Sequence, residues 1–232
     1  MDNTFILEIL DQEGMINIEQ GMNIYHLLTQ TLLQNIEGDV VELGCHKGAV
    51  AAIIQKTLEE NNSNKKLFLY DSFKGLPEKN EKDGNTRFQE GWCKTDESKV
   101  YDFFKKNEIK KPKIFSGWFK DTLPKKLPKK ISFAHLDGDF YSSIKESLEN
   151  IYPKLSKGAV VVIDDYYNNK IHKEIEKLIN KNKYSKKSGR KIKIDCILPG
   201  VKKACDRFFK NKKESLNLLI SGEERHVYFR KK

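Results

Sequence analysis

Acidic residues follow two strongly apolar segments at the point where each segment ends. "FAHLDGD" places Asp137 and Asp139 after one segment, and "AVVVIDD" places Asp164 and Asp165 after the next. Neighbouring parallel strands lie about 4.8 Å apart and end at the same sheet edge, so the carboxylates of Asp137, Asp164 and Asp165 are expected to converge. Like charges that close raise one another's pKa, so a positive group is expected among them. A surface lysine is one candidate, but an all-oxygen cluster favours a hard cation, Mg²⁺ first, with Ca²⁺ or Mn²⁺ also compatible.

A glycine turn precedes this pair of segments and suggests a second binding element. "VELGCHKG" carries Glu42 and then the spacing Gly44-x-x-x-Gly48, which lets a ligand approach the backbone where side chains would block it. The next apolar segment ends in Asp71, whose carboxylate could accept both hydroxyls of a ribose. The combination fits a nucleoside-bearing cofactor, such as an adenosine with a short amino-acid tail, because no Walker lysine is present to cradle phosphates.

The elements that must position these residues alternate between apolar strands and amphipathic helices. The apolar runs predict strands over residues 38–44, 65–71, 111–117, 131–137 and 159–165. The apolar spacing predicts helices over residues 16–35, 49–58, 99–107 and 142–155. Strands that are apolar throughout are typical of a parallel sheet covered on both faces. The chain is therefore predicted to form an open, doubly wound α/β domain.

The C-terminal part predicts one more helix and two more strands. The helix spans residues 200–209, and the strands span 216–220 and 226–231, with at least one antiparallel strand. No repeat or linker interrupts the chain, so residues 1–232 are predicted to form one domain with an N-terminal helical segment over residues 1–37. Residues 168–199 form a lysine-rich insertion. It is either a solvated excursion or a lid over an anionic sugar acceptor.

Composition and charge restrict the class of protein. The formal net charge is +10 and the sequence pI is about 9.2, but the excess lysine is spread along the chain and favours a solvated surface over a nucleic-acid site. Residues 181–193 are the exception, because their basic density could contact an anion. No apolar run is long enough to span a membrane, the first residues carry acids, and the four cysteines form no C-x-x-C pair. A cytoplasmic protein without membrane contact is therefore expected.

Six motifs follow one another over residues 38–209. In chain order they are "VELGCHKGAVA", "LYDSFKGLP", "FSGWFKDTLP", "HLDGDFYSS", "YPKLSKGAVVVIDDY" and "GVKKACDRF". Together they resemble the macrocin O-methyltransferase family, the S-adenosylmethionine-dependent sugar methyltransferases of macrolide pathways. "DSFxGLP", "DGDxYxS" and "IDDY" are the specific elements. The resemblance implies a Rossmann-like class I methyltransferase fold with a mostly parallel seven-stranded sheet.

The resemblance also implies roles for particular residues. The residues that would bind S-adenosylmethionine are Glu42, Gly44, Cys45, His46 and Gly48 at its methionine part, Asp71 and Ser72 at its ribose, Ser116, Gly117 and Trp118 at its adenine, and Asp137. Asp137, Asp164 and Asp165 match the three metal ligands. Asp164 is a departure from the pattern, because glutamate is common at that position and aspartate is shorter.

A mechanism follows from these roles. Mg²⁺ would bind two neighbouring sugar hydroxyls, lower the pKa of one and orient its oxygen towards the methyl group. Asp137 or Asp139 is the nearest base, with His46 and His135 behind them. His135 fits a packed strand residue better, and Asp139 has the alternative role of capping the helix that begins near Ser142.

Two other functions are compatible with the sequence. An RNA methyltransferase would use the basic surface, although no stripe of aromatic and basic residues supports it. An inactive methyltransferase-fold domain could serve as a binding scaffold, but Glu42, Asp71 and the metal-type acids are all present. The expected partner is a sugar-containing acceptor, and the resemblance implies a homodimer.

Overall fold

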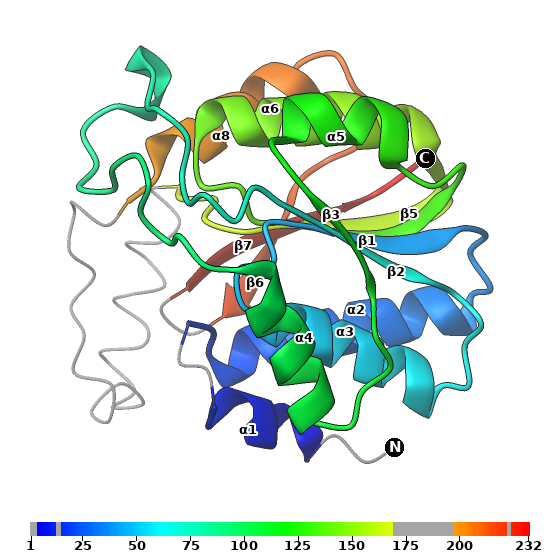
Figure 1. The fold of residues 1–232 in the computed structure, drawn as a ribbon. Coiled ribbons are helices and arrows are strands. Elements are labelled where there is room, and N and C mark those ends of the chain that lie inside the picture. The colour runs from blue at the N-terminus through cyan, green and yellow to red at the C-terminus, as the bar shows by residue number, and fades with distance from the viewer. Residues whose placement is uncertain (1–3, 13–14, 169–196, 222–223) are drawn as a thin grey trace, which may run out of the picture.

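A seven-stranded sheet forms the centre of the molecule in this computed structural model, which describes residues 4–12, 15–168, 197–221 and 224–232. The strand order is β3-β2-β1-β4-β5-β7-β6 (Figure 1). The strands are β1 (Asp39–Leu43), β2 (Leu67–Asp71), β3 (Lys113–Ser116), β4 (Ile131–Leu136), β5 (Leu155–Ile163), β6 (Asn217–Ser221) and β7 (Glu224–Arg230). The predicted strands are all present.

Helices cover both faces of this sheet, as predicted (Figure 1). One face carries α1 (Phe5–Leu10), α2 (Ile18–Leu33), α3 (Ala49–Glu60) and α4 (Glu97–Lys106). The opposite face carries α5 (Phe119–Lys126), α6 (Tyr141–Ile151) and α8 (Pro199–Phe209). Two short 3₁₀ turns, η1 (Glu81–Asp83) and η2 (Tyr152–Lys154), complete the described elements.

The strand pairing brings the acidic ends of several strands to one edge. β1 pairs in parallel with β2 and β4, and β4 pairs in parallel with β5, so these four strands all end on the same side. β7 runs antiparallel to both β5 and β6, which confirms an antiparallel strand in the C-terminal pair. The adjacency of β4 and β5 is the condition on which convergence of Asp137 with Asp164 and Asp165 depended.

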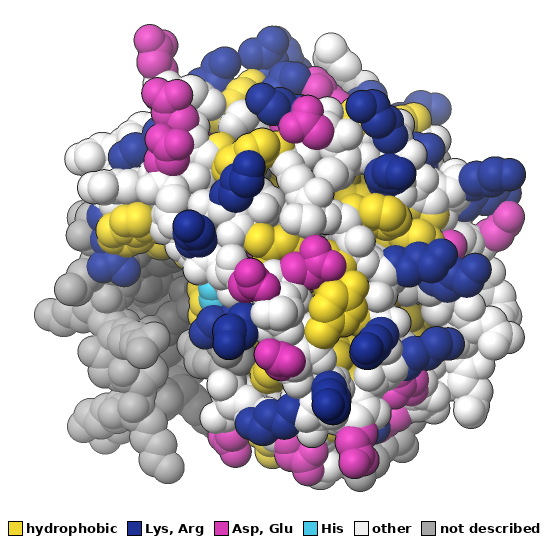
Figure 2. Space-filling model, viewed as in Figure 1, with side chains coloured by type: hydrophobic (Ala, Val, Ile, Leu, Met, Phe, Trp, Pro, Cys, Tyr) yellow, Lys and Arg dark blue, Asp and Glu magenta, His cyan; other side chains and the backbone are white. Residues whose placement is uncertain are grey.

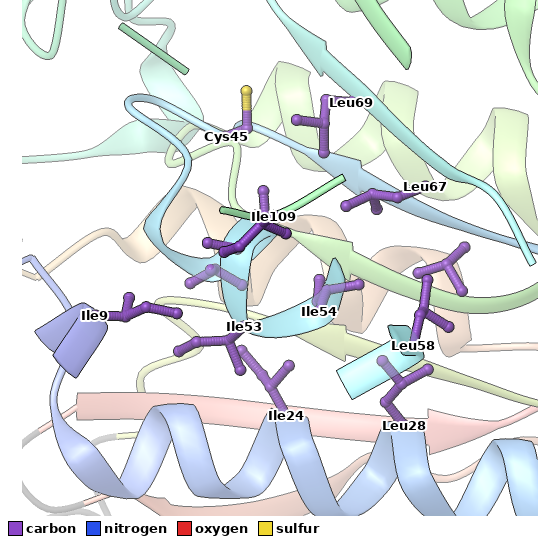
Figure 3. Close-up of a cluster of buried hydrophobic side chains, with 14 of the residues drawn as sticks. Ile9, Ile24, Leu28, Cys45, Ile53, Ile54, Leu58, Leu67, Leu69 and Ile109 are labelled. Atoms are coloured by element: carbon purple, nitrogen blue, oxygen red, sulfur yellow. The ribbon is translucent and has the colours of Figure 1, made fainter. Parts of the chain in front are cut away.

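Apolar packing on each face fixes the sheet. Figure 3 shows Ile24 and Leu28 of α2 pointing towards Ile53 and Leu58 of α3, with Leu67 on the β2 side of the same cluster. All of these side chains are at most 2% exposed. Full burial of one such side chain contributes about 1.5–3 kcal/mol, so this layer holds the β1–α3 turn rigidly against the sheet.

One helix and one strand boundary differ from the sequence prediction. The segment over α5, "FKDTLPKK", has three lysines and a proline, and its only deeply buried side chains are Thr122 and Leu123, so its apolar residues are too few for a clear amphipathic pattern. α1 lies inside the N-terminal helical segment predicted over residues 1–37, although its six residues are too few for a periodic pattern of their own. β5 begins at Leu155, earlier than the predicted residue 159, because the polar residues Ser156 and Lys157 also belong to the strand.

Two other expectations concern membrane-spanning helices and the lysine-rich insertion. No helix in the described part of the chain is long and apolar enough to cross a membrane. Of the predicted insertion over residues 168–199, positions 169–196 lie outside the described residues, and so does the basic run over residues 181–193. The assignment of residues 1–232 to one domain stays a prediction.

A buried aspartate joins three segments next to the acidic edge. Asp83 of η1 is 1% exposed, and its Oδ1 accepts a hydrogen bond from the backbone N–H of Tyr141, at the start of α6, at 2.6 Å. Its Oδ2 accepts from the N–H of Asn80 at 2.9 Å. Gly200 of α8 lies against the same carboxylate, because a Cβ atom there would be 2.1 Å from Oδ1. Asp83 therefore caps α6 from a distant loop, a contact that no local motif indicates.

Replacing Asp83 with alanine is expected to lower the free energy of unfolding by about 1–3 kcal/mol, because two N–H groups lose their acceptor in a buried site. Urea titration followed by circular dichroism measures this change. Glu81→Ala is the matched control, since Glu81 is an exposed acid two positions away in the same turn. Equal loss of stability in both variants would contradict the capping role.

A second buried acid predicts a pH dependence of stability. The Glu214 carboxylate accepts from Lys231 Nζ at 3.0 Å, from Tyr152 Oη at 2.8 Å and from the Lys232 N–H at 3.2 Å. Burial alone would raise the pKa of Glu214, but these donors outweigh it and lower the pKa from 4.5 to about 2.

Because the folded-state pKa is depressed, the ionised Glu214 stabilises the fold above about pH 4.5, and this contribution is lost as the pH falls towards 2. Glu214→Gln is therefore expected to cost about 2 kcal/mol of unfolding free energy at pH 7 and much less at pH 2.5. Chemical unfolding at both pH values measures the difference. A loss that is the same at the two pH values would contradict the assignment.

Candidate active site

A cavity of about 540 Å³ opens at the edge where β1, β2, β4 and β5 end. Its floor comes from the residues that follow these strands, and its walls come from the segments before α2, after β2 and around the starts of α5 and α6. The predicted site residues that line it are Gly44, His46, Asp71, Ser72, Trp118, Asp137, Asp139, Asp164 and Asp165. Those that do not line it are Glu42, Cys45, Gly48, Ser116 and Gly117.

The glycine turn after β1 is closed tightly against β4. Gly44 has a φ of +90°, and a Cβ atom at this position would be 1.8 Å from the backbone oxygen of Asp137. Glycine is therefore required here both by conformation and by space. His46 also has a positive φ, of 47°, which is unusual for a residue with a side chain and is typical of functional turns. Gly48 then begins α3 with a φ of 93°.

Asp71 holds this turn in place. Its Oδ2 accepts hydrogen bonds from the backbone N–H groups of Cys45 and His46, at 3.0 and 2.9 Å, and its Oδ1 accepts from the N–H of Phe73 at 2.8 Å. A carboxylate has about four acceptor positions. One acceptor position on Oδ1 is therefore left for a ligand hydroxyl. Asp71 would need two free acceptor positions to bind both hydroxyls of a ribose by itself.

Three carboxylates converge on the cavity floor. Asp137, Asp139 and Asp165 each place one oxygen within 4.8 Å of the others. Burial, followed by the neighbouring carboxylates of Asp164, Asp139 and Asp165, raises the pKa of Asp137 well above its ordinary value. Burial, with Asp164 and Asp71, raises the pKa of Asp139 to about 7. The expected convergence of Asp137 with Asp165 is present, but the third member of this group is Asp139 where Asp164 was predicted.

Asp164 lies beside the group and is held by other residues. Its Oδ1 is 2.6 Å from Nε2 of His226 and accepts from the Asp165 N–H at 2.7 Å. Burial would raise the pKa of Asp164, but His226 and this N–H keep it below its ordinary value. Gln20 completes the contact, because its amide nitrogen is 2.7 Å from His226 Nε2 and 3.5 Å from Asp164 Oδ2.

Both partners of Asp164 were absent from the sequence prediction. His226 lies in β7, and a single histidine in an apolar C-terminal strand gives no signal of its own. Gln20 is part of the capping box of α2, where its side chain accepts from the Asn17 N–H, so the sequence indicates only a helix start. Only the antiparallel pairing of β7 with β5 brings His226 next to Asp164.

Glu42 occupies a buried position beneath the turn. Its Oε1 is 3.1 Å from Nδ1 of His135, and both side chains are 1% exposed. Burial raises the pKa of Glu42, and the neighbouring histidine offsets part of this effect. Glu42 Oε2 and His135 Nε2 have no hydrogen-bond partner among the described residues. His135 is thus a packed strand residue, while the role of Glu42 in cofactor binding stays a prediction.

Asp139 does not cap α6, because the first residue before the helix is Phe140 and no side chain caps it locally. Asp83 fulfils that function, as described above. Asp139 and Asp165 both have positive φ values, of 59° and 57°. Such backbone strain in non-glycine residues concentrates at functional sites.

The donor set fits a divalent cation and the turn fits a cofactor. Carboxylate oxygens that lie this close repel one another, and this repulsion adds to burial in raising the pKa of Asp137. A hard cation would offset both effects. At the turn, Gly44 brings the backbone to the cavity surface without a side chain. Trp118 and Phe119 add aromatic surface to the same cavity.

The fold and the site together define the class of protein. A mostly parallel seven-stranded sheet, with its reversed strand β7 and a cavity at the ends of β1, β2 and β4, is the Rossmann-like fold of class I O-methyltransferases. The structure entitled O-methyltransferase NovP superposes with a TM-score of 0.70 at 22% identity, covering 93% of this chain and 80% of that one. An O-methyltransferase from Bacillus cereus in complex with SAH gives a TM-score of 0.61 at 12% identity, covering 100% and 92%.

The family is shown by the sequence comparison. The Macrocin-O-methyltransferase (TylF) family profile matches residues 12–230, and the chain belongs to this family. A similar curated protein is the 8-demethyl-8-(2,3-dimethoxy-alpha-L-rhamnosyl)-tetracenomycin-C 4'-O-methyltransferase of Streptomyces olivaceus, 30% identical over 161 residues. That match covers 66% of this chain and 62% of the relative, so a substantial part of the relative has no counterpart in the match.

Proposed function

We propose that this protein transfers the methyl group of S-adenosylmethionine to a hydroxyl of a sugar, with Mg²⁺ or another hard divalent cation in the acidic group. The observation that carries the proposal is that Asp137 and Asp165 converge with Asp139, and that Asp164 lines the same cavity beside the glycine turn. The curated relative's printed name, a methyltransferase acting on a rhamnosyl compound, supports a sugar acceptor.

Each side chain has a role in this proposal. When bound, S-adenosylmethionine supplies an electrophilic methyl group, and a divalent cation lowers the pKa of a hydroxyl beside it. Asp137, Asp164 and Asp165 would hold the cation, and the His226 contact would fix the orientation of Asp164, as partners of metal-binding side chains commonly do. Asp139 lines the cavity next to these ligands and would accept the hydroxyl proton.

The remaining residues would bind and orient the cofactor. The turn from Gly44 to Gly48 exposes backbone for its amino-acid end, and Asp71 has one acceptor position for a ribose hydroxyl. Trp118, with the neighbouring Ser116 and Gly117, would contact the adenine. Holding the methyl donor and the hydroxyl in line converts the transfer into an intramolecular step, which is the main contribution expected from positioning.

The test is a product analysis. The protein is incubated with isotopically labelled S-adenosylmethionine, Mg²⁺ and a panel of glycosides, nucleotide sugars and glycans, with RNA offered in a parallel reaction, and the products are identified by mass spectrometry and NMR. A methyl ether on a sugar carbon is the expected result. Labelled RNA with no labelled sugar would instead support the RNA methyltransferase, and failure to bind S-adenosylmethionine in calorimetry would support the inactive scaffold. A homodimer remains a separate prediction, checked by light scattering.

A further inference from the structure

The cavity wall carries a charge opposite to that of the whole chain. The formal net charge is +10, yet Lys120 is the only lysine or arginine among the described residues that line the cavity. The same cavity is lined by the five aspartates of the site and by three glutamates, Glu78, Glu90 and Glu146. Figure 2 shows lysine and arginine side chains distributed between acidic and hydrophobic ones over an outer face, so the basic charge lies on the surface.

The cavity keeps more negative than positive charge when the charges of the proposed cofactor and cation are added. The sulfonium cofactor adds a single positive charge and a divalent cation adds two, which together with Lys120 do not balance the eight carboxyl groups. Asp137, Asp164 and Asp165 would hold the cation, whereas Glu78 and Glu90 come from the segment after β2 that forms the outer wall. The described wall of the part of the cavity left for the acceptor is therefore negative, and a cavity of one sign focuses its field on entering ligands.

Aromatic side chains accompany these glutamates. Phe88 lines the cavity, and Trp92 packs edge-on against it with ring centroids 5.8 Å apart. Trp92 is 42% exposed, which is high for so large an apolar side chain. Aromatic rings beside carboxylates suit a ligand with apolar C–H surface and no negative charge. Phe88 itself already carries a cation–π contact, because the Arg87 guanidinium lies 5.7 Å from its ring centroid.

We propose that the acceptor is an uncharged sugar or an amino sugar, and that the cavity selects against acceptors carrying phosphate or carboxylate groups. The proposal rests on the proposed function, since it concerns the sugar that would enter the same cavity. It disfavours a sugar nucleotide as the acceptor. A lysine-rich lid over the cavity would instead favour such an anionic acceptor.

Cys93 allows the charge of the cavity to be measured without any acceptor. Its thiol is exposed and lines the cavity, whereas Cys45 and Cys205 are buried. The full chain carrying Cys196→Ser is treated with a cationic reagent, 2-(trimethylammonium)ethyl methanethiosulfonate, and with an anionic one, 2-sulfonatoethyl methanethiosulfonate. The ratio of the cationic to the anionic reaction rate at Cys93 is divided by the same ratio measured with 2-mercaptoethanol. The raised pKa of Cys93, about 11, slows both reagents alike and cancels in the ratio.

The cationic reagent is expected to be favoured at Cys93 by at least about tenfold at low ionic strength, and the preference should shrink as salt is added. The double variant E78Q/E90Q should reduce the preference several-fold. E81Q is the control, because Glu81 is exposed on the same segment but does not line the cavity. Equal rates, or a preference for the anionic reagent, would overturn the proposal.

A second arm tests the acceptor class directly with labelled S-adenosylmethionine and Mg²⁺. The probes are p-nitrophenyl glucoside, p-nitrophenyl glucosaminide, p-nitrophenyl glucuronide and UDP-glucose. Methyl transfer to the neutral or amino sugar at rates at least tenfold above those for the two anionic probes would support the proposal, and the reverse order would overturn it. If none is methylated, the proposed function loses support, while the Cys93 rates still decide the charge of the cavity.

Discussion

Replacing Asp137 with asparagine is expected to abolish methyl transfer and, at the same time, to stabilise the cation-free protein. The variant removes one proposed ligand, so turnover should fall by at least about a hundredfold, in the range found when a group that stabilises developing charge is lost. It also removes an acid whose pKa is raised first by burial and then by the neighbouring carboxylates, so that keeping this acid in the cation-free fold costs free energy at neutral pH. An asparagine of similar size carries no such cost, so the melting temperature in EDTA should rise by a few degrees.

Three measurements separate these effects. Calorimetry with S-adenosylhomocysteine should give nearly unchanged affinity, since the turn from Gly44 to Gly48 and Asp71 remain intact. Asp102→Asn is the control, because Asp102 is an exposed aspartate of α4 away from the cavity, and neither turnover nor stability should change. Full turnover by Asp137→Asn, or a lower melting temperature without metal, would mean that these carboxylates do not form a repelling metal site.

Gly44→Ala is expected to eliminate cofactor binding and to destabilise the fold by several kcal/mol. The added Cβ would be 1.8 Å from the Asp137 backbone oxygen, a distance that backbone atoms cannot tolerate without movement. Relief requires β1 and β4 to separate where Leu43 accepts a hydrogen bond from the Asp137 N–H at 2.8 Å. The positive φ of Gly44 adds strain of about 1 kcal/mol or more for alanine.

Gly91→Ala separates conformational strain from the collision. Gly91 has a φ of +78°, close to that of Gly44, but a Cβ atom there would meet nothing within 4 Å. The control should therefore lose only about 1 kcal/mol and retain affinity for S-adenosylhomocysteine. Both variants are compared by urea unfolding and calorimetry. If Gly91→Ala were as damaging as Gly44→Ala, close packing of the turn against β4 would not be the reason for the glycine.

The parts of the fold that the sequence predicts are those with a strong local signal. β2, β4 and the second half of β5 are mostly apolar runs that end in or precede acids, so both the sheet and the edge that carries Asp71, Asp137 and Asp165 could be placed in advance. α5 could not, because its helical face against the core is supplied by little more than Thr122 and Leu123. A helix stabilised mainly by its neighbours leaves no periodic pattern in its own sequence.

The finer arrangement of the site depends on contacts between distant parts of the chain. The role of Asp164 as a metal ligand stays a prediction, but its partner was not foreseen, because only the antiparallel placement of β7 brings His226 to 2.6 Å from it. Asp83 caps α6 across 58 positions of sequence, where a local cap by Asp139 had been considered. Strand periodicity gives the direction of a side chain but not the distant partner that it meets.

The outer wall of the cavity was likewise not predictable. The segment after β2 contributes Leu76, Glu78, Phe88 and Glu90 through an irregular path that is tied back by backbone hydrogen bonds, such as that from the Leu76 N–H to the Trp92 oxygen at 2.8 Å. Irregular segments have no periodicity from which to deduce facing residues. The structure therefore adds most to the sequence prediction on the side of the cavity where the acceptor would bind.

The central claim, methyl transfer to a sugar hydroxyl at a cation held by these aspartates, is tested most directly by metal removal and return. Turnover of the sugar that serves as acceptor is measured with labelled S-adenosylmethionine in EDTA-treated protein, and again after MgCl₂ is added in excess. Transfer should cease in EDTA and recover with Mg²⁺ in wild type, and it should fail to recover in Asp137→Asn. Unchanged turnover in EDTA would contradict the account.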